Sequence, residues 1–294
     1  MKVKKIVFKG NLEVVGVYNF NRTGKWDGNN NHKFAKQDKN GIDYTSSRCL
    51  RHEMFKDAIP MQPSTEDARN KFVKFASSEV GILRGYLNAG DELKRASPLH
   101  VADAYTISAS GQSLVFFDQG SSSKPKEANQ KNKKGEDASD VSMFSVDNAP
   151  PRKQLFEAIL NLKELQFLSL DRNYNPMVNA NQEEEFLKGV STTFNEMGAD
   201  SAVKKSEFTE ISSLYETKRE GVLLNDSQLR SLCGRTLGRI LSIDGVKTSS
   251  RLKIDRSSLM VEISDNIEKR EYSVSDFRLA LKDLQFHFFY SESN

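Results

Sequence analysis

The sequence predicts an α+β fold in which helices pack on one antiparallel sheet. Two observations predict it: segments in which β-branched or aromatic residues recur, and segments whose apolar residues recur every three or four positions. Strand-like segments lie at 4–20, 164–170, 207–224, 259–263 and 284–290. Helical segments lie at 46–58, 64–79, 155–160, 183–190 and 226–241. Two helices against one antiparallel sheet are typical of a ferredoxin-like domain.

Polar segments separate these elements. Residues 21–41 follow the first strand-like stretch, lack apolar periodicity and contain Trp26, the only tryptophan, so we expect a long loop there. Residues 118–140 have no large apolar side chain and mix both charge signs, which predicts a mobile loop. Loops of this length are usually functional or disordered.

The segment 46–58 is predicted to be an amphipathic helix, with Ser46 or Ser47 as its N-cap. Apolar residues four positions apart form one stripe: Leu50, Met54 and Ala58. Basic residues form a second stripe on the opposite side: Arg48, His52 and Lys56, with Arg51 beside it. One side of this helix can pack on a sheet while the other presents positive hydrogen-bond donors.

Charge is unevenly distributed. Residues 1–60 hold 12 Lys and Arg against 6 Asp and Glu, whereas the rest of the chain holds 31 against 34. A basic segment on a nearly neutral protein indicates either a directed contact with a polyanion or a lysine-rich solvated surface.

Composition narrows the class of protein. Mean hydropathy is −0.59, and no uncharged apolar stretch approaches the ~18 residues of a membrane span. No signal peptide is expected, because charged and polar residues stand where its apolar region would lie. Two cysteines cannot form a disulfide framework, so we expect a reducing cytoplasm.

Cofactor and metal motifs are not found. The four histidines are scattered, the two cysteines lie far apart, and no phosphate-binding glycine motif occurs, so we expect no metal or cofactor. Three aspartates precede the basic helix: Asp27, Asp38 and Asp43. They are either ordinary surface residues or carboxylates that assist RNA cleavage by proton transfer or metal binding.

Other polar and aromatic residues have two interpretations each. Arg84 lies in an apolar run and needs an anionic partner, either a carboxylate or a phosphate. Lys94 and Arg95 either contact RNA or form intramolecular salt bridges. Met143 and Phe144 either wedge between bases or pack in the core. Trp26 either stacks on a base or anchors its loop.

Five segments occur in an order and spacing that resemble the Cas7 backbone subunit of the CRISPR type I effector complex (Cascade), closest to the type I-F variant. They are Tyr44–Phe55, Gly81–Tyr86, Lys94–Leu99, Leu165–Asp171 and Gly221–Asp226. The resemblance implies a single RAMP-type domain over 1–294, with an RNA-recognition-like palm. Its inserted segments would be a loop at 21–43, fingers at 87–150 and a thumb at 173–220.

The resemblance also implies a function. Such a subunit is not an enzyme in type I complexes; it binds CRISPR RNA, stacks helically with other copies and leaves the guide free to pair with target DNA. Its partners would include other CRISPR effector subunits but no membrane. In related type III complexes the corresponding subunit cleaves target RNA with a loop aspartate. We therefore expect RNA-binding residues at Ser46, Arg48, Arg51, His52, Lys56, Arg84, Lys94, Arg95, Trp26, Met143, Phe144 and Arg172.

Overall fold

A computed structural model describes residues 1–16, 18–22, 31–57, 66–107, 115–118, 151–211, 217–247, 250–265 and 267–293. Several sequence-based expectations lie outside these residues. They are Trp26, Asp27, Met143, Phe144 and all but the first residue of the expected 118–140 loop.

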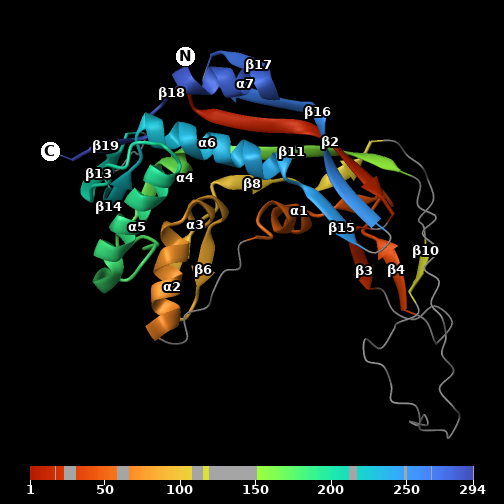
Figure 1. Ribbon diagram of the computed structural model, residues 1–294, viewed down its shortest axis with the longest axis horizontal. Helices are drawn as coiled ribbons and strands as arrows, with labels where there is room; N and C mark the ends of the chain where they lie inside the picture. Colours follow the sequence, from red (N-terminus) through yellow and green to blue (C-terminus); the bar gives the residue numbers. More distant parts are fainter. Residues whose placement is uncertain are drawn as a thin grey trace, which may run out of the picture.

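The centre of the molecule is an eight-stranded, curled antiparallel sheet (Figure 1). Its three long strands are β2 (Lys5–Val15), β11 (Arg152–Asn161) and β16 (Ser250–Ser264), with β2 in the middle. The shorter strands are β5 (Tyr44–Thr45), β8 (Leu99–Val101), β9 (Ala104–Thr106), β15 (Asp244–Lys247) and β17 (Lys269–Ser273). Residues of β11 alternate between buried and more exposed positions, as expected when one face of a sheet covers the core.

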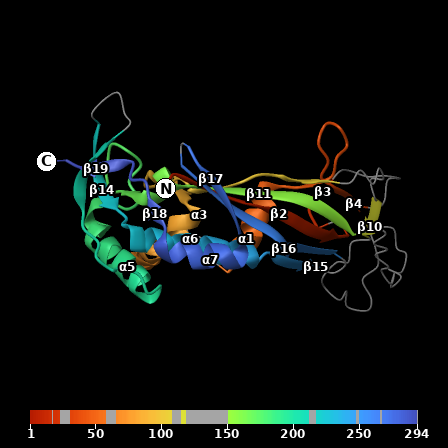
Figure 2. The same cartoon turned by 90° about the horizontal axis from the view of Figure 1, so that it is seen from above.

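Helices cover one face of this sheet (Figure 2). They include α1 (Ser47–Met54), α6 (Asp226–Leu241) and α7 (Val274–Ala280), whose apolar residues join those of the strands in one core. Phe8 of β2 meets Phe277 of α7 edge to face, with ring centroids 6.3 Å apart. The predicted helix at 226–241 is confirmed, with Asn225 capping it through the backbone N–H of Gln228.

Smaller sheets lie at opposite ends of the central sheet (Figure 1). At one end β12 (Phe167–Ser169), β14 (Lys218–Leu223), β13 (Ser206–Glu210) and β19 (Tyr290–Glu292) form a four-stranded sheet near α4 (Leu162–Gln166) and α5 (Glu183–Glu196). At the other end are β3 (Phe20–Arg22), β4 (Asn31–Ala35) and β10 (Val115–Asp118).

Two further helices lie between α1 and β8 along the chain. They are α2 (Glu66–Ser77) and α3 (Glu79–Arg84), followed by the strand pair β6 (Tyr86–Asn88) and β7 (Leu93–Arg95). Helix α2 packs on α5, and Gly189 permits their close approach, because a Cβ there would lie 2.3 Å from the Oγ of Ser77. Strand β1 (Lys2–Val3) pairs with β18 (Gln285–Phe286), and single 3₁₀ turns occur at Ala180–Gln182 and Leu281–Asp283.

Four local predictions are wrong. Residues 155–160 lie within a strand, because β2, β8 and β9 pair along β11 and override the helical pattern. The expected strand at 164–170 begins only at Phe167, after a helix capped by Asn161. The expected loop at 21–41 contains β4 and part of β3, and the expected strand at 284–290 is two separate short strands.

None of the helices in the described ranges is both long enough and apolar enough to cross a membrane.

Candidate nucleic-acid interface

Helix α1 is held at its N-terminus by polar contacts. The Ser46 Oγ accepts hydrogen bonds from the backbone N–H of Cys49 at 3.4 Å and from the Asn19 side chain at 3.3 Å. The backbone N–H of Ser47 donates to Asp103 Oδ1 at 2.6 Å. Of the two candidate serines, Ser46 is therefore the N-cap, and these bonds fix where the helix begins.

The inner side of α1 anchors the helix to the body of the protein. Leu50 and Met54 are buried in the core, as their spacing predicts. Glu53 is buried beside them and accepts a hydrogen bond from the hydroxyl of Tyr18. A buried carboxylate needs such a donor, so this contact sets the rotation of the helix about its axis.

The outer side of α1 presents three exposed basic residues: Arg48, His52 and Lys56. The side chains of Arg48 and His52 have no hydrogen-bond or ion-pair partner within the described part of the chain. Lys56 donates to the Asp244 carbonyl at 3.0 Å, and its Nζ lies 3.5 Å from Glu53 Oε2. The predicted basic stripe is thus exposed to solvent, and within the described residues the side chains of Arg48 and His52 remain available to bind an anion.

Arg51 turns toward the C-terminus of α3 and meets a second arginine there. Its Nη2 donates to the backbone carbonyl of Arg84 at 2.6 Å. Burial lowers the pKa of Arg51, and the positive charge of Arg84 lowers it further. Burial also lowers the pKa of Arg84. Two half-buried like charges are unfavourable together, and an anion placed beside them would stabilise both.

Gly85 joins α3 to the following strand pair. Its φ of 68° lies in the left-handed region, and a Cβ there would lie 2.5 Å from the carbonyl oxygen of Arg95. Residue 85 must therefore be a glycine for β7 to approach the end of α3 this closely. As a result, Arg84 and Arg95 come from neighbouring backbone segments.

Arg95 lies beneath the surface rather than on it. Its Nη1 donates to the Phe167 carbonyl at 2.6 Å and its Nε to the Ile82 carbonyl at 3.3 Å. Neither contact is the salt bridge that the sequence suggested, and burial lowers its pKa to about 10. Lys94, one residue earlier, is exposed. The pair therefore divides between interior and surface, because successive side chains of a strand point in opposite directions.

Arg172 is exposed but lies away from α1. It follows β12 and lines a hollow with residues of α5, β13 and β14, including Glu183, Glu207 and Glu220. The structure therefore places Arg172 at the four-stranded end of the molecule and does not bring it to the basic stripe.

Two of the candidate catalytic aspartates serve the local fold. Asp38 Oδ1 accepts the backbone N–H groups of Asn40 at 2.8 Å and Ile42 at 2.9 Å, so it closes a turn. Asp43 Oδ2 lies 3.2 Å from Nη1 of Arg152, whose side chain is only 4% exposed. These carboxylates are already committed to backbone and ion-pair contacts.

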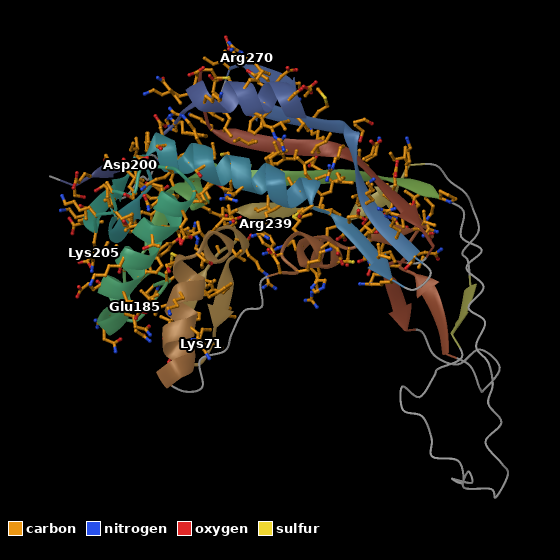
Figure 3. All side chains as sticks on the ribbon, viewed as in Figure 1. Lys71, Glu185, Asp200, Lys205, Arg239 and Arg270 are labelled. Carbon is orange, nitrogen blue, oxygen red and sulfur yellow. The ribbon has the colours of Figure 1, made fainter. Side chains whose placement is uncertain are left out.

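Arg239 of α6 is an important contact that the sequence did not reveal. It lies between α6 and the ends of α1 and α3 (Figure 3) and pairs with Asp57 at 2.6 Å and Glu79 at 3.1 Å. Sequence spacing places Arg239 off the apolar stripe of its helix. No sequence signal links it to carboxylates more than 150 positions away.

The comparisons with known proteins identify the chain as a CRISPR-associated protein and an effector-complex subunit. Residues 13–282 match the family model described as type I-Fv CRISPR-associated protein Cas7fv-like. The chain belongs to this Cas7fv-like family, which confirms the expected Cas7 subunit of a type I complex and specifies the subtype as I-Fv.

Two other comparisons do not narrow the family further. A search of curated protein sequences finds no significant match. Among solved structures, the chain is similar to one from a crystal structure of the Csm3–Csm4 subcomplex in the type III-A CRISPR–Cas interference complex. The two share 11% identity with a TM-score of 0.36, over 98% of this chain and 100% of that one.

Proposed function

We propose that this protein is a non-enzymatic backbone subunit that binds CRISPR RNA along the outer side of α1. One observation carries the proposal: α1 presents Arg48 and His52 without partners in the described residues, beside the like-charged pair of Arg51 and Arg84. Family membership supports it, because the match covers most of the chain.

The chemistry of this surface suits the RNA backbone. A scaffold that accepts any guide sequence must bind phosphates and sugars and leave the base edges free. Arginine offers a planar fork of donors that matches phosphate oxygens, whereas Lys56 supplies a compact charge at the end of the helix. His52 adds a donor in either neutral tautomer.

The assembly is part of the same proposal. We propose an RNA-recognition-like palm, with inserted segments that contact neighbouring copies and other effector subunits in the cytoplasm. Copies would stack helically along the guide and present it to target DNA. Exposed Lys94 and Arg172 lie beyond α1 and are proposed as further points of RNA contact.

RNA cleavage by a loop aspartate, as in type III complexes, is the alternative function. The contacts of Asp38 and Asp43 favour a structural role for both carboxylates. Incubation of the assembled complex with complementary RNA and Mg²⁺ discriminates between the two functions. Intact RNA supports the scaffold, whereas products at a regular interval would establish the enzyme.

Salt-dependent RNA binding tests the α1 surface directly. Each phosphate contact contributes a slope of about −0.7 in log affinity against log salt for single strands. Replacing Arg48, Arg51 and Lys56 together with alanine should reduce the slope by about two units in fluorescence anisotropy. A charge-matched control replaces three exposed, carboxylate-paired cations elsewhere: Lys188, Lys204 and Arg270.

The control variant should retain the wild-type slope. An unchanged slope in the α1 variant, or an equal loss in the control, would remove α1 from the binding surface.

Assembly is tested by co-expression with a CRISPR array: the scaffold predicts RNA-containing particles that grow as the guide lengthens. A monodisperse monomer without RNA would contradict the proposal.

A further inference from the structure

A second cationic site lies at the junction of β7, α4 and the four-stranded sheet. The junction borders an open pocket of about 400 Å³. Four cations contribute to its lining: Lys94, Arg95, Lys163 and Arg219. Two aromatic rings, Tyr174 and Tyr290, form part of the wall. Of these residues, only Lys94 and Arg95 were expected from the sequence to contact RNA.

We propose that this pocket binds a phosphate group of the RNA backbone, as a second anchor for the strand that follows α1. The proposal rests on the proposed function and extends it to a site with its own residues. The residues that would hold the phosphate are Arg219 and Arg95, with Lys94 beside them.

Unsatisfied donors carry the argument. Arg95 is 8% exposed, and two of its nitrogens donate to backbone carbonyls, but its Nη2 has no partner in the described residues. Nε of Arg219 is likewise buried without a partner there. A buried donor on a charged group is costly to leave unpaired, and both arginines line the same pocket, so an acceptor that paired with them there would remove this cost.

The geometry around Arg219 prepares it for an anion. Its guanidinium carbon lies 3.5 Å from the centre of the Tyr174 ring, so the ring covers one face of the group. Tyr290 is itself fixed by stacking on Phe167, with centroids 4.9 Å apart. Stacking restricts the guanidinium to one plane and leaves its edge for the ligand, which reduces the entropy lost on binding.

The pocket is lined by two carboxylates, each with a contact of its own, and the charge of Glu164 also acts on Arg95. Glu210 Oε1 pairs with Lys163 at 2.5 Å, and Glu164 lies 3.0 Å from the imidazole of His100. Neither arginine forms an ion pair with a carboxylate in the described ranges. With four cations against two carboxylates, the lining retains positive charge that an oxyanion would neutralise.

The position of the pocket favours RNA over an acidic protein segment. Arg51 of the α1 surface donates to the Arg84 carbonyl, and Arg95 of the pocket donates to the Ile82 carbonyl. Both arginines thus bind the last turn of α3, one from the α1 surface and one from the pocket. Exposed Lys94 adjoins Arg95 in sequence and also lines the pocket. A strand bound along α1 can therefore continue to the pocket.

The test compares Arg219→Gln with Arg270→Gln, an exposed arginine outside the pocket, in anisotropy titrations with single-stranded RNA. Arg219→Gln should lower affinity about tenfold near 0.15 M salt and reduce the salt slope by about 0.7. Arg270→Gln should change neither value. Lys94→Gln, an exposed substitution that does not threaten folding, should give a smaller loss in the same direction.

Inorganic phosphate provides an independent readout. Phosphate at millimolar concentration should raise the melting temperature of the wild type more than chloride of equal ionic strength, and Arg219→Gln should abolish the difference. If the pocket variants retain wild-type slopes while the α1 variant loses two units, the inference is wrong and the proposed function stands. If they retain RNA binding but weaken self-association, the pocket binds a protein carboxylate instead. A wild type that binds no RNA overturns both.

Discussion

Arg239 and Asp57 form a close ion pair: Nη1 of the arginine lies 2.6 and 2.7 Å from the two carboxylate oxygens. The Nε of the same guanidinium donates to Glu79 at 3.1 Å. Asp57 follows α1 and Glu79 begins α3, so one side chain of α6 holds the two segments that position Arg51 and Arg84. The basic surface therefore depends on a residue that does not belong to it.

Replacement of Arg239 with methionine should lower the free energy of unfolding by about 2 kcal/mol, because it leaves the largely buried Glu79 without its partner. Urea denaturation measures the change. Arg235→Met is the matched control, since Arg235 is an exposed arginine one turn earlier in α6. The control should change stability by less than ~0.5 kcal/mol. Equal effects of the two substitutions would show that the Arg239 pairs are not responsible.

Acidification should weaken the same contact. The hydrogen bond from Arg239 holds the pKa of Asp57 below its ordinary value. Its contribution to stability is therefore complete above the unfolded-state pKa of about 3.9 and is lost as pH falls through the lower folded-state pKa. Asp57→Asn should lose less stability than the wild type between about pH 4 and 2, measured from melting temperatures. A steeper decline in the variant would contradict this sign.

Gly189→Ala should destabilise the contact between α2 and α5. The added methyl would meet Ser77 Oγ at 2.3 Å, and the resulting displacement should cost about 1–3 kcal/mol. Gly238→Ala in α6 is the control, because no atom lies within 4 Å of its added Cβ. That substitution should stabilise the protein by up to ~1 kcal/mol through helix propensity. Thermal denaturation should therefore show a lower melting temperature for Gly189→Ala and a higher one for Gly238→Ala. An unchanged or raised melting temperature for Gly189→Ala would contradict the close contact between α2 and α5.

Asp43→Asn should lower stability by about 3 kcal/mol, because it leaves the buried Arg152 guanidinium without its counter-charge. Asp38→Asn, in the exposed turn, should cost less than ~1 kcal/mol. With either variant, complementary RNA mixed with the assembled complex should remain uncleaved, as with the wild type. A loss of RNA cleavage without a loss of stability in either variant would assign that aspartate to catalysis.

Local pattern was sufficient for part of the candidate site. The spacing of Leu50 and Met54 against Arg48, His52 and Lys56 predicted which sides of α1 are buried and exposed, because helical periodicity is a local property. The same periodicity predicted α6 over residues 226–241, and the structure shows Asn225 as its cap.

Contacts between residues far apart in the sequence decided the remaining features of the fold and of the candidate site. Residues 155–160 form a strand because β2 and β8 pair along them. Arg95 points inward because its side chain donates hydrogen bonds to backbone carbonyls of α3 and β12. The sequence alone determined the amphipathic helix, which is encoded in neighbouring residues, and the family resemblance, which is carried by short segments in a fixed order along the chain. Only the tertiary structure brought Arg95, Arg219 and Tyr174 to one pocket, because backbone pairing and burial join segments that no local spacing connects.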